Sequence, residues 1–199
     1  MTKQPQRPGT EACSPAPPSP GPARLSVSDT RADLAEKADI AMYEDDDERM
    51  EAAEQLARLD PRSGAEAFRA IAGDEGADNE QRIDAAEQLT RLDRRAAAEA
   101  FRAIACDESV DDGLRVEAAE RIPRLDRRAA AEAFRVIACD ESVDDGLRSS
   151  AAEQLPGLDP WAAAEAFRLI VSDPIMDDGL RASAAEQLAR LNPEPLGRQ

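Results

Sequence analysis

The sequence contains no histidine, which removes the side chain that most often serves as a general base or a metal ligand. Only three cysteines are present, Cys13, Cys106 and Cys139, and they form no Cys-x-x-Cys pair. Cys106 and Cys139 occupy the same place in successive copies of a repeat, so we expect them to lie about 8–10 Å apart. That separation is too large for a disulfide. The sequence therefore predicts no disulfide framework, no metal site and no cofactor.

Long apolar runs are absent as well. No stretch of 18 apolar residues occurs, and the N-terminus has no apolar segment of the signal-peptide type. We therefore expect a cytoplasmic protein without membrane contact. Lys3 and Lys37 are the only lysines. The bias towards arginine and alanine indicates a GC-rich coding genome.

Basic residues are few relative to acidic ones. The chain has 25 arginines and lysines against 42 aspartates and glutamates, and its formal net charge is −17. A nucleic-acid-binding domain usually carries a basic stripe, so the composition argues against direct nucleic-acid binding. A charge of this size favours solubility or attracts a basic partner.

What the sequence does contain is a block of 33 residues that recurs without gaps. Residues 85–117 and 118–150 are identical at 27 positions. A fixed period of this length is typical of stacked repeat proteins, in which each unit buries its apolar face against its neighbours. The sequence predicts an all-α superhelix, or solenoid, of about four to five two-helix repeats. We place the repeats at 52–84, 85–117, 118–150 and 151–183, with a half repeat at 184–192.

Each repeat reads as two helices. In the third repeat the first helix begins near Asp111 and ends about Leu125, and the second begins after Asp126. Aspartates at these starts are typical N-caps. One phenylalanine recurs in each second helix, and we expect this column to fill the core. The column consists of Phe68, Phe101, Phe134 and Phe167.

The segments outside the repeats differ in composition. Residues 1–27 hold seven of the fourteen prolines and are predicted to be a disordered tail, although their proline run could also bind an SH3-like groove. The helical domain is placed at 28–192, followed by a short tail at 193–199. It is predicted to begin with a degenerate helix over 29–42, in which Ser28 is the N-cap and Leu34 lies near the position of the repeat phenylalanine. The last hairpin is half built, so its open side could be covered by a partner or a second copy.

An acidic run, 44–48, precedes the first repeat. It aligns with the loops that begin the later first helices, so we interpret it as favourable charge at a helix N-terminus. A divalent-cation site is the alternative, although the spacing matches no EF-hand loop.

The repeats resemble HEAT-like repeats, especially the short bacterial PBS-lyase type. The resemblance rests on Asp107, on Leu114-Arg115 followed by Ala118-Ala119, and on Leu125, and it covers roughly 44–192. It implies that an aspartate and an arginine of successive units form a ladder along the stack. The residues of this expected ladder are Asp74, Arg82, Asp107, Arg115, Asp140, Arg148, Asp173 and Arg181.

Tetratricopeptide units are the alternative, since they have a similar length and an element like Ala97–Phe101. Their Gly-and-Tyr pattern and closing proline are absent here. Pro123 and Pro156 depart from a regular repeat, and we expect them to bend or shorten the first helices of repeats three and four.

A column of glutamates recurs on the first helices, opposite the apolar stripe. Its members are Glu54, Glu87, Glu120, Glu153 and Glu186, and four of them have an arginine four residues on, at Arg58, Arg91, Arg124 and Arg190. This order favours ion pairs along a helix. A solvated helix face explains the column. The functional alternative, drawn from the resemblance, is that the column lines a concave surface and binds a basic peptide.

Three further residues are candidates for function. Trp161 could anchor a partner or pack under the start of its helix. Cys106 and Cys139 are expected on the exposed side of their helices, where a neighbouring arginine could lower the thiol pKa. Small incidental surface residues are the simpler interpretation of both cysteines.

The sequence predicts no catalytic residues. No carboxylate pair lies in an apolar setting, no Ser or Cys has a histidine base, and no glycine-rich phosphate loop occurs. We therefore predict a non-enzymatic scaffold that binds a protein or peptide, basic in charge if the glutamate column is its site. The alternatives are an acidic DNA mimic that regulates a DNA-binding protein and, because bilin lyases with such repeats exist, an accessory or lyase-type enzyme.

Overall fold

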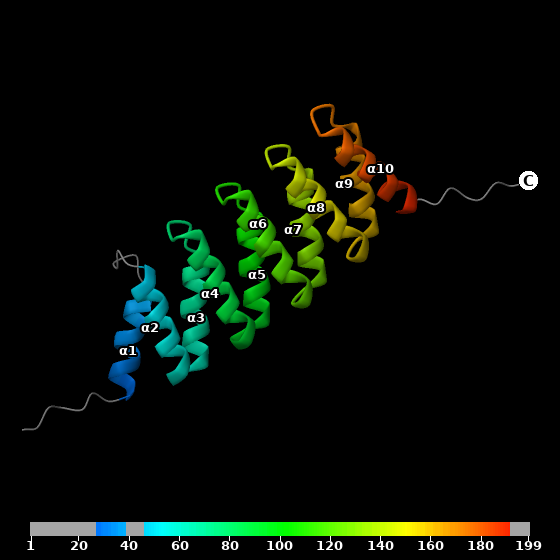
Figure 1. Ribbon diagram of the computed structural model, residues 1–199. Coiled ribbons are helices and arrows are strands. Elements are labelled where there is room, and N and C mark those ends of the chain that lie inside the picture. The colour runs from blue at the N-terminus through cyan, green and yellow to red at the C-terminus, as the bar shows by residue number, and fades with distance from the viewer. Residues whose placement is uncertain (1–26, 39–45, 192–199) are drawn as a thin grey trace, which may run out of the picture.

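The computed structural model describes residues 27–38 and 46–191, and within them the protein is a row of α-helices without strands (Figure 1). The predicted all-α repeat fold is confirmed. In chain order the helices are α1 (Val27–Ala38), α2 (Asp46–Leu59), α3 (Pro61–Ala72), α4 (Asn79–Leu92), α5 (Arg94–Ala105), α6 (Asp112–Arg121), η1 (Ile122–Arg124), α7 (Arg127–Cys139), α8 (Asp145–Gln154), η2 (Leu155–Gly157), α9 (Pro160–Ser172) and α10 (Asp178–Leu191), where η denotes a 3-10 turn.

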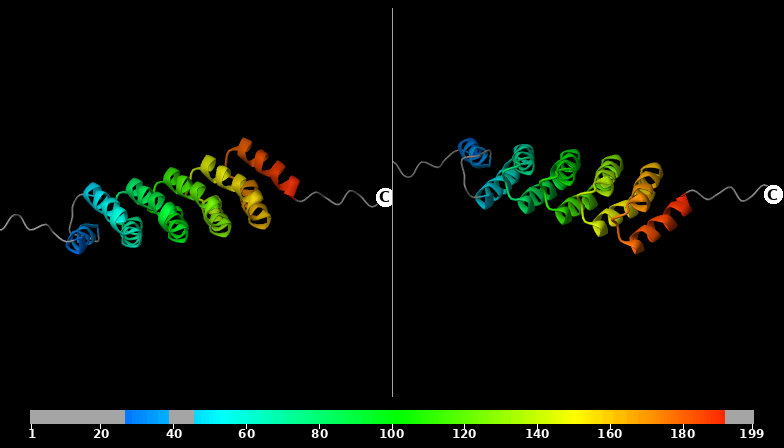
Figure 2. Two further views of the ribbon diagram at one scale, coloured as in Figure 1. Left: turned by 90° about the horizontal axis from the view of Figure 1, so that it is seen from below. Right: turned by 90° about the horizontal axis from the view of Figure 1, so that it is seen from above.

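The helices form two parallel rows (Figure 2). We call α2, α4, α6, α8 and α10 the first-helix row, and α1, α3, α5, α7 and α9 the second-helix row. Each helix packs against the next helix in the chain and against its counterpart in the neighbouring hairpin. Burial therefore occurs at interfaces between adjacent units, as expected for a stacked repeat.

The core is made of alanines and one large residue per layer. The repeat phenylalanines are all at most 1% exposed, and an isoleucine three residues further on is fully buried in each second helix. Buried alanines, such as Ala86 and Ala119, let neighbouring helices approach closely. The phenylalanine fills the space that these small side chains leave.

Aspartates begin nearly every helix. The side chains of Asp60, Asp93, Asp126 and Asp159 accept backbone N–H groups at the starts of the second helices. Asp78, Asp111, Asp144 and Asp177 do the same for the first helices. The predicted N-caps are confirmed at these aspartates. Asp45, the equivalent residue before α2, lies outside the described residues.

Prolines shorten two first helices, as predicted. α4 runs as one helix to Leu92, whereas α6 ends at Arg121 and a 3-10 turn that contains Pro123 follows. Pro156 has the same effect after α8. The proline lacks an N–H group and cannot continue the α-helical hydrogen bonds.

An arginine of the preceding repeat compensates for each proline. Arg94 donates to the Arg124 carbonyl at 2.6 Å, and Arg127 donates to the Gly157 carbonyl, so both carbonyls at the ends of the 3-10 turns are satisfied. The first helices α4 and α10 contain no proline, and in the repeats that precede them the position of Arg94 is occupied by Pro61 and Pro160. An arginine at the position of Arg94 therefore occurs only where the next first helix is shortened by a proline.

The helix that precedes the repeats is present, but it starts earlier than predicted. α1 begins at Val27, so Ser28 lies inside its first turn and is not its N-cap. Leu34 is buried, in keeping with its place near the repeat phenylalanine. Arg31 forms an ion pair with Asp60 at 2.5 Å and thereby joins α1 to α3.

Several predictions fall outside the described residues. These are the two tails, Cys13, the end of the first predicted helix and, in the acidic run, Glu44 and Asp45; Asp46, Asp47 and Glu48 form the first turn of α2.

The phenylalanine column provides a test of the packing. We expect Phe101→Ala to lower the free energy of unfolding by about 3–5 kcal/mol, because the small neighbours cannot collapse into the cavity. Urea unfolding followed by circular dichroism measures this change. Leu169→Ala, at an exposed position of the same row, is the control and should cost much less. A loss below about 1 kcal/mol for Phe101→Ala would contradict the packing described here.

Candidate functional site

A ladder of ion pairs runs through the stack. Each rung joins an arginine of one first helix to an aspartate in the loop before the next first helix. The rungs are Arg49–Asp74 at 2.9 Å, Arg82–Asp107 at 3.1 Å, Arg115–Asp140 at 3.0 Å and Arg148–Asp173 at 2.8 Å. The ladder therefore connects neighbouring repeats at a constant sequence separation.

The arginines of the ladder are buried side chains. Arg115 is only 1% exposed, and its guanidinium also donates to the Ala105 carbonyl at 3.3 Å and approaches Asp112 at 3.4 Å. A buried guanidinium is tolerated only when its charge is paired and its N–H groups are bonded. These contacts give the ladder a structural role.

Each ladder aspartate also organises its own loop. Oδ1 of Asp140 accepts the backbone N–H and the hydroxyl of Ser142, while Oδ2 accepts from Arg115. Asp107 binds Ser109 and Arg82 in the same way. The serine hydrogen bonds, followed by the arginine, hold the pKa of both carboxyls below its usual range.

Two positions of the ladder differ from the expectation. Arg49 supplies a rung that the sequence comparison did not include, although it lies 33 residues before Arg82. Arg181 does not form a comparable rung in the described part of the chain: its side chain is 35% exposed and contacts Asp178 and the Asp173 carbonyl.

Acid should weaken the ladder. The pKa of the Asp140 carboxyl is lower in the folded protein than in the unfolded chain, where it is about 3.9. The contribution of this carboxylate to stability is therefore fully present above the unfolded-state pKa and is lost as the pH falls through the folded-state pKa. We expect Asp140→Asn to destabilise the protein by about 3 kcal/mol at pH 7 and to reduce the loss of stability between about pH 5 and 3. Urea unfolding at several pH values measures both effects.

The control is Glu141→Gln, which changes an exposed neighbouring carboxylate. If Asp140→Asn and Glu141→Gln behave alike at every pH, Asp140 does not hold the ladder together.

The glutamate column lies on the first-helix row, but its ion pairs only partly follow the predicted spacing. Glu54 pairs with Arg58 at 3.2 Å and Glu186 pairs with Arg190 at 3.7 Å. Glu87 contacts Arg121 of the next repeat instead of Arg91.

The predicted pair between Glu120 and Arg124 is not formed. Pro123 ends α6 before Arg124, so the 3-10 turn removes this arginine from the helical position four residues after Glu120. Among the described residues, Glu120 and Glu153 are exposed and form no ion pair. They are the two column members whose helices are shortened by proline.

Grooves separate the helices of the first row. The groove between α4 and α6 has a volume of about 570 Å³, and a smaller one of about 260 Å³ lies one repeat earlier, between α2 and α4. The larger groove is lined by Glu87, Gln88, Thr90, Arg91, Phe101, Glu120, Arg121, Arg124 and Leu125. The first-helix row therefore presents the same kind of groove at successive repeats. We call this surface the first-helix face.

The expectation that the glutamate column lines a concave surface stays a prediction.

The last hairpin exposes apolar side chains. Trp161 is 81% exposed at the start of α9, so the interpretation that it packs under the helix start is wrong. Ile175, in the loop after α9, is 90% exposed and was not singled out by its sequence. On α10, Ala185 is exposed, whereas the equivalent Ala152 is fully buried in the stack.

The two cysteines of the described chain do not lie on the exposed side of their helices. Cys106 and Cys139 are free thiols, half-buried and packed against the core. Burial raises the pKa of the Cys106 thiol, and the nearby Arg102 offsets this only in part. Burial also raises the pKa of the Cys139 thiol. This environment opposes thiolate formation, so it does not favour reactive cysteines.

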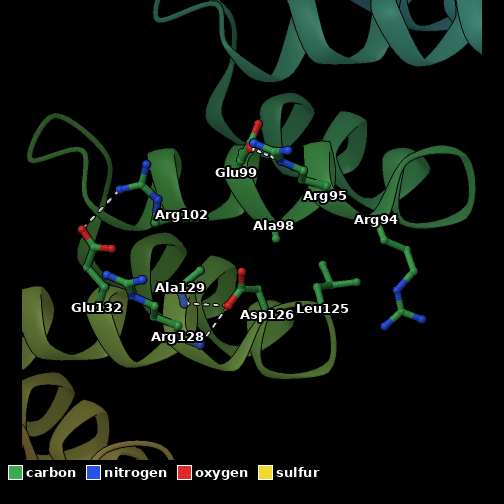
Figure 3. Close-up of a pocket in the computed structure, with 10 residues that line it drawn as sticks. All are labelled: Arg94, Arg95, Ala98, Glu99, Arg102, Leu125, Asp126, Arg128, Ala129 and Glu132. Atoms are coloured by element: carbon green, nitrogen blue, oxygen red, sulfur yellow. Dashed lines mark hydrogen bonds and ion pairs between the residues drawn. The ribbon is translucent and has the colours of Figure 1, made fainter.

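A second kind of groove lies on the opposite face, between α5 and α7 (Figure 3). It has a volume of about 790 Å³ and was not predicted. Its lining consists of Arg94, Arg95, Ala98, Glu99, Arg102, Leu125, Asp126, Arg128, Ala129 and Glu132. The sequence signal was the segment Arg-Leu-Asp-Arg-Arg, which occurs at both 91–95 and 124–128.

Comparisons with known proteins identify no relative. No family model, no curated protein and no solved structure matches the chain. Within 27–38 and 46–191, no three His, Cys, Asp or Glu side chains are arranged to hold a metal ion. None of the helices described is both long and apolar enough to span a membrane.

Proposed function

We propose that the protein is a non-enzymatic, cytoplasmic scaffold of HEAT-like repeats, whose first-helix face binds a basic peptide segment of a partner protein. The observation that carries this proposal is the groove beside Glu120, because it combines an exposed carboxylate with an apolar side. Phe101 and Leu125 contribute to its lining.

The carboxylates available for such a partner are Glu120 and Glu153. They lie at equivalent positions of adjacent first helices, so they are about one helix spacing apart, roughly 8–10 Å. Neither is neutralised by an arginine within the described chain. A basic side chain of a partner would gain an ion pair here without breaking an existing one.

A second candidate is an acidic DNA mimic, and the loops favour it. Four carboxylates lie in each of the segments 74–80, 107–112 and 140–145, which connect successive hairpins along one edge of the stack. A DNA-binding protein would contact this edge, not the first-helix face. The two candidates therefore depend on different residues.

Charge reversal distinguishes the two candidates. We expect Glu120→Lys with Glu153→Lys to reduce recovery of the specific partner about tenfold or more in affinity purification from the native host, because two ion pairs become repulsions. The matched variant, Glu108→Lys with Glu141→Lys, has the same change in net charge and reverses the loop edge. It should leave the partner bound.

Loss of the partner only in the loop variant would instead support the DNA mimic. The proposal for the first-helix face fails if the partner is retained by Glu120→Lys with Glu153→Lys, or if roughly 0.15 M and 1 M salt recover it equally.

We also propose that two copies associate through the outer side of the last hairpin. The exposed Ala185 and the partly buried Leu188 lie where a further repeat would pack. Light scattering should then show a concentration-dependent dimer that Ala185→Arg converts to a monomer. A wild-type chain that stays monomeric up to about 1 mM would contradict this proposal.

A further inference from the structure

The turns before α5 and α7 form an unusual accumulation of unpaired positive charge. We call residues 91–95 and 124–128 the arginine edge. Its six arginines are all exposed, in a chain with 42 acidic and 25 basic residues. Only Arg95 has a carboxylate within ion-pair distance in the described part of the chain, since it contacts Glu99 at 2.9 Å.

The aspartates within the arginine edge are already engaged. Asp126 accepts the backbone N–H groups of Arg128 and Ala129. Asp93 caps α5 in the same way and also pairs with Arg69 at 3.1 Å. These carboxylates neutralise helix starts, so they do not neutralise Arg128 on the wall of the groove. Arg94 and Arg127 donate to the carbonyls of the 3-10 turns.

The groove of Figure 3 opens at this edge. Ala98, Ala129 and Leu125 form its small apolar floor, with Arg95 on one wall and Arg128 on the other. Arg128 forms no ion pair within the described chain, and its guanidinium lies along the groove.

The other end of the groove is bridged. Arg102 of α5 reaches Glu132 of α7 at 3.4 Å (Figure 3). The accessible part therefore lies between this bridge and the arginine edge. α5 is about 18 Å long, which corresponds to five or six residues of an extended chain.

We propose that this groove binds an extended acidic peptide segment of a partner protein, with its carboxylates on the two wall arginines, Arg95 and Arg128. Guanidinium groups recognise carboxylates through paired N–H donors, and the alanine floor leaves room for a peptide backbone. A long nucleic acid carries phosphates beyond the groove, where the net charge of −17 repels them. The site is distinct from the first-helix face and binds a ligand of opposite charge.

The test uses the full chain and a fluorescein-labelled octapeptide of alternating glutamate and alanine. Fluorescence anisotropy at about 0.05 M salt should show binding, and Arg95→Gln with Arg128→Gln should weaken it at least about tenfold. The matched control is Arg135→Gln with Arg168→Gln, which removes the same charge from exposed arginines of the second-helix row that form no described ion pair. It should change the affinity less than about threefold.

Three results would overturn the proposal. They are equal losses in the two double variants, equal binding of the matching glutamine-alanine peptide, and tighter binding of a single-stranded oligonucleotide with the same number of charges. Because the assay uses a purified chain and an acidic probe, its failure leaves the proposal for the first-helix face untouched. Failure of that proposal likewise leaves this one standing.

Discussion

The buried arginine of each first helix is the constraint on which the stack depends. Arg82, Arg115 and Arg148 are almost fully shielded from water, and each reaches a carboxylate that belongs to the following repeat. Taking a guanidinium out of water is costly, so the next loop must be in place for the arginine to be tolerated. The same aspartates fix the loops through their second oxygen. Neighbouring repeats therefore depend on one another for charge as well as for apolar burial.

The features that were predictable from the sequence are those set by local chemistry and by the 33-residue period. The capping aspartates, the phenylalanine core and the shortening of helices at Pro123 and Pro156 all follow from rules that act within a few residues. Periodicity added the two-row arrangement, since copies of one unit must pack alike. The start of α1 was misjudged by two residues because Ser28 is a good cap in isolation, whereas the observed helix begins before it.

The candidate sites were less predictable, since they depend on distances between repeats. Glu87 contacts Arg121 of the neighbouring first helix, and the spacing of residues within one helix predicts Arg91 as its partner instead. The half-burial of Cys106 likewise depends on how deeply its helix end lies in the stack. The groove beside Arg128 lies between α5 and α7, with Ala98 of one helix and Ala129 of the other in its lining, so neither helix alone predicts it. Trp161 could be singled out by its chemistry, but only the structure shows that it is exposed.

The pairing of Arg94 with the turn at Pro123, and of Arg127 with the turn at Pro156, makes the repeats unequal as building blocks. A chain shortened by removal of 85–117 would join the repeat that carries Pro61 to the one that carries Pro123. The Arg124 carbonyl would then face a proline ring, which has no donor to offer. The order of the units, and not only their number, is thus part of what the sequence encodes. Copying or deleting repeats preserves these hydrogen bonds only when each repeat with a proline at the position of Pro123 follows a repeat with an arginine at the position of Arg94.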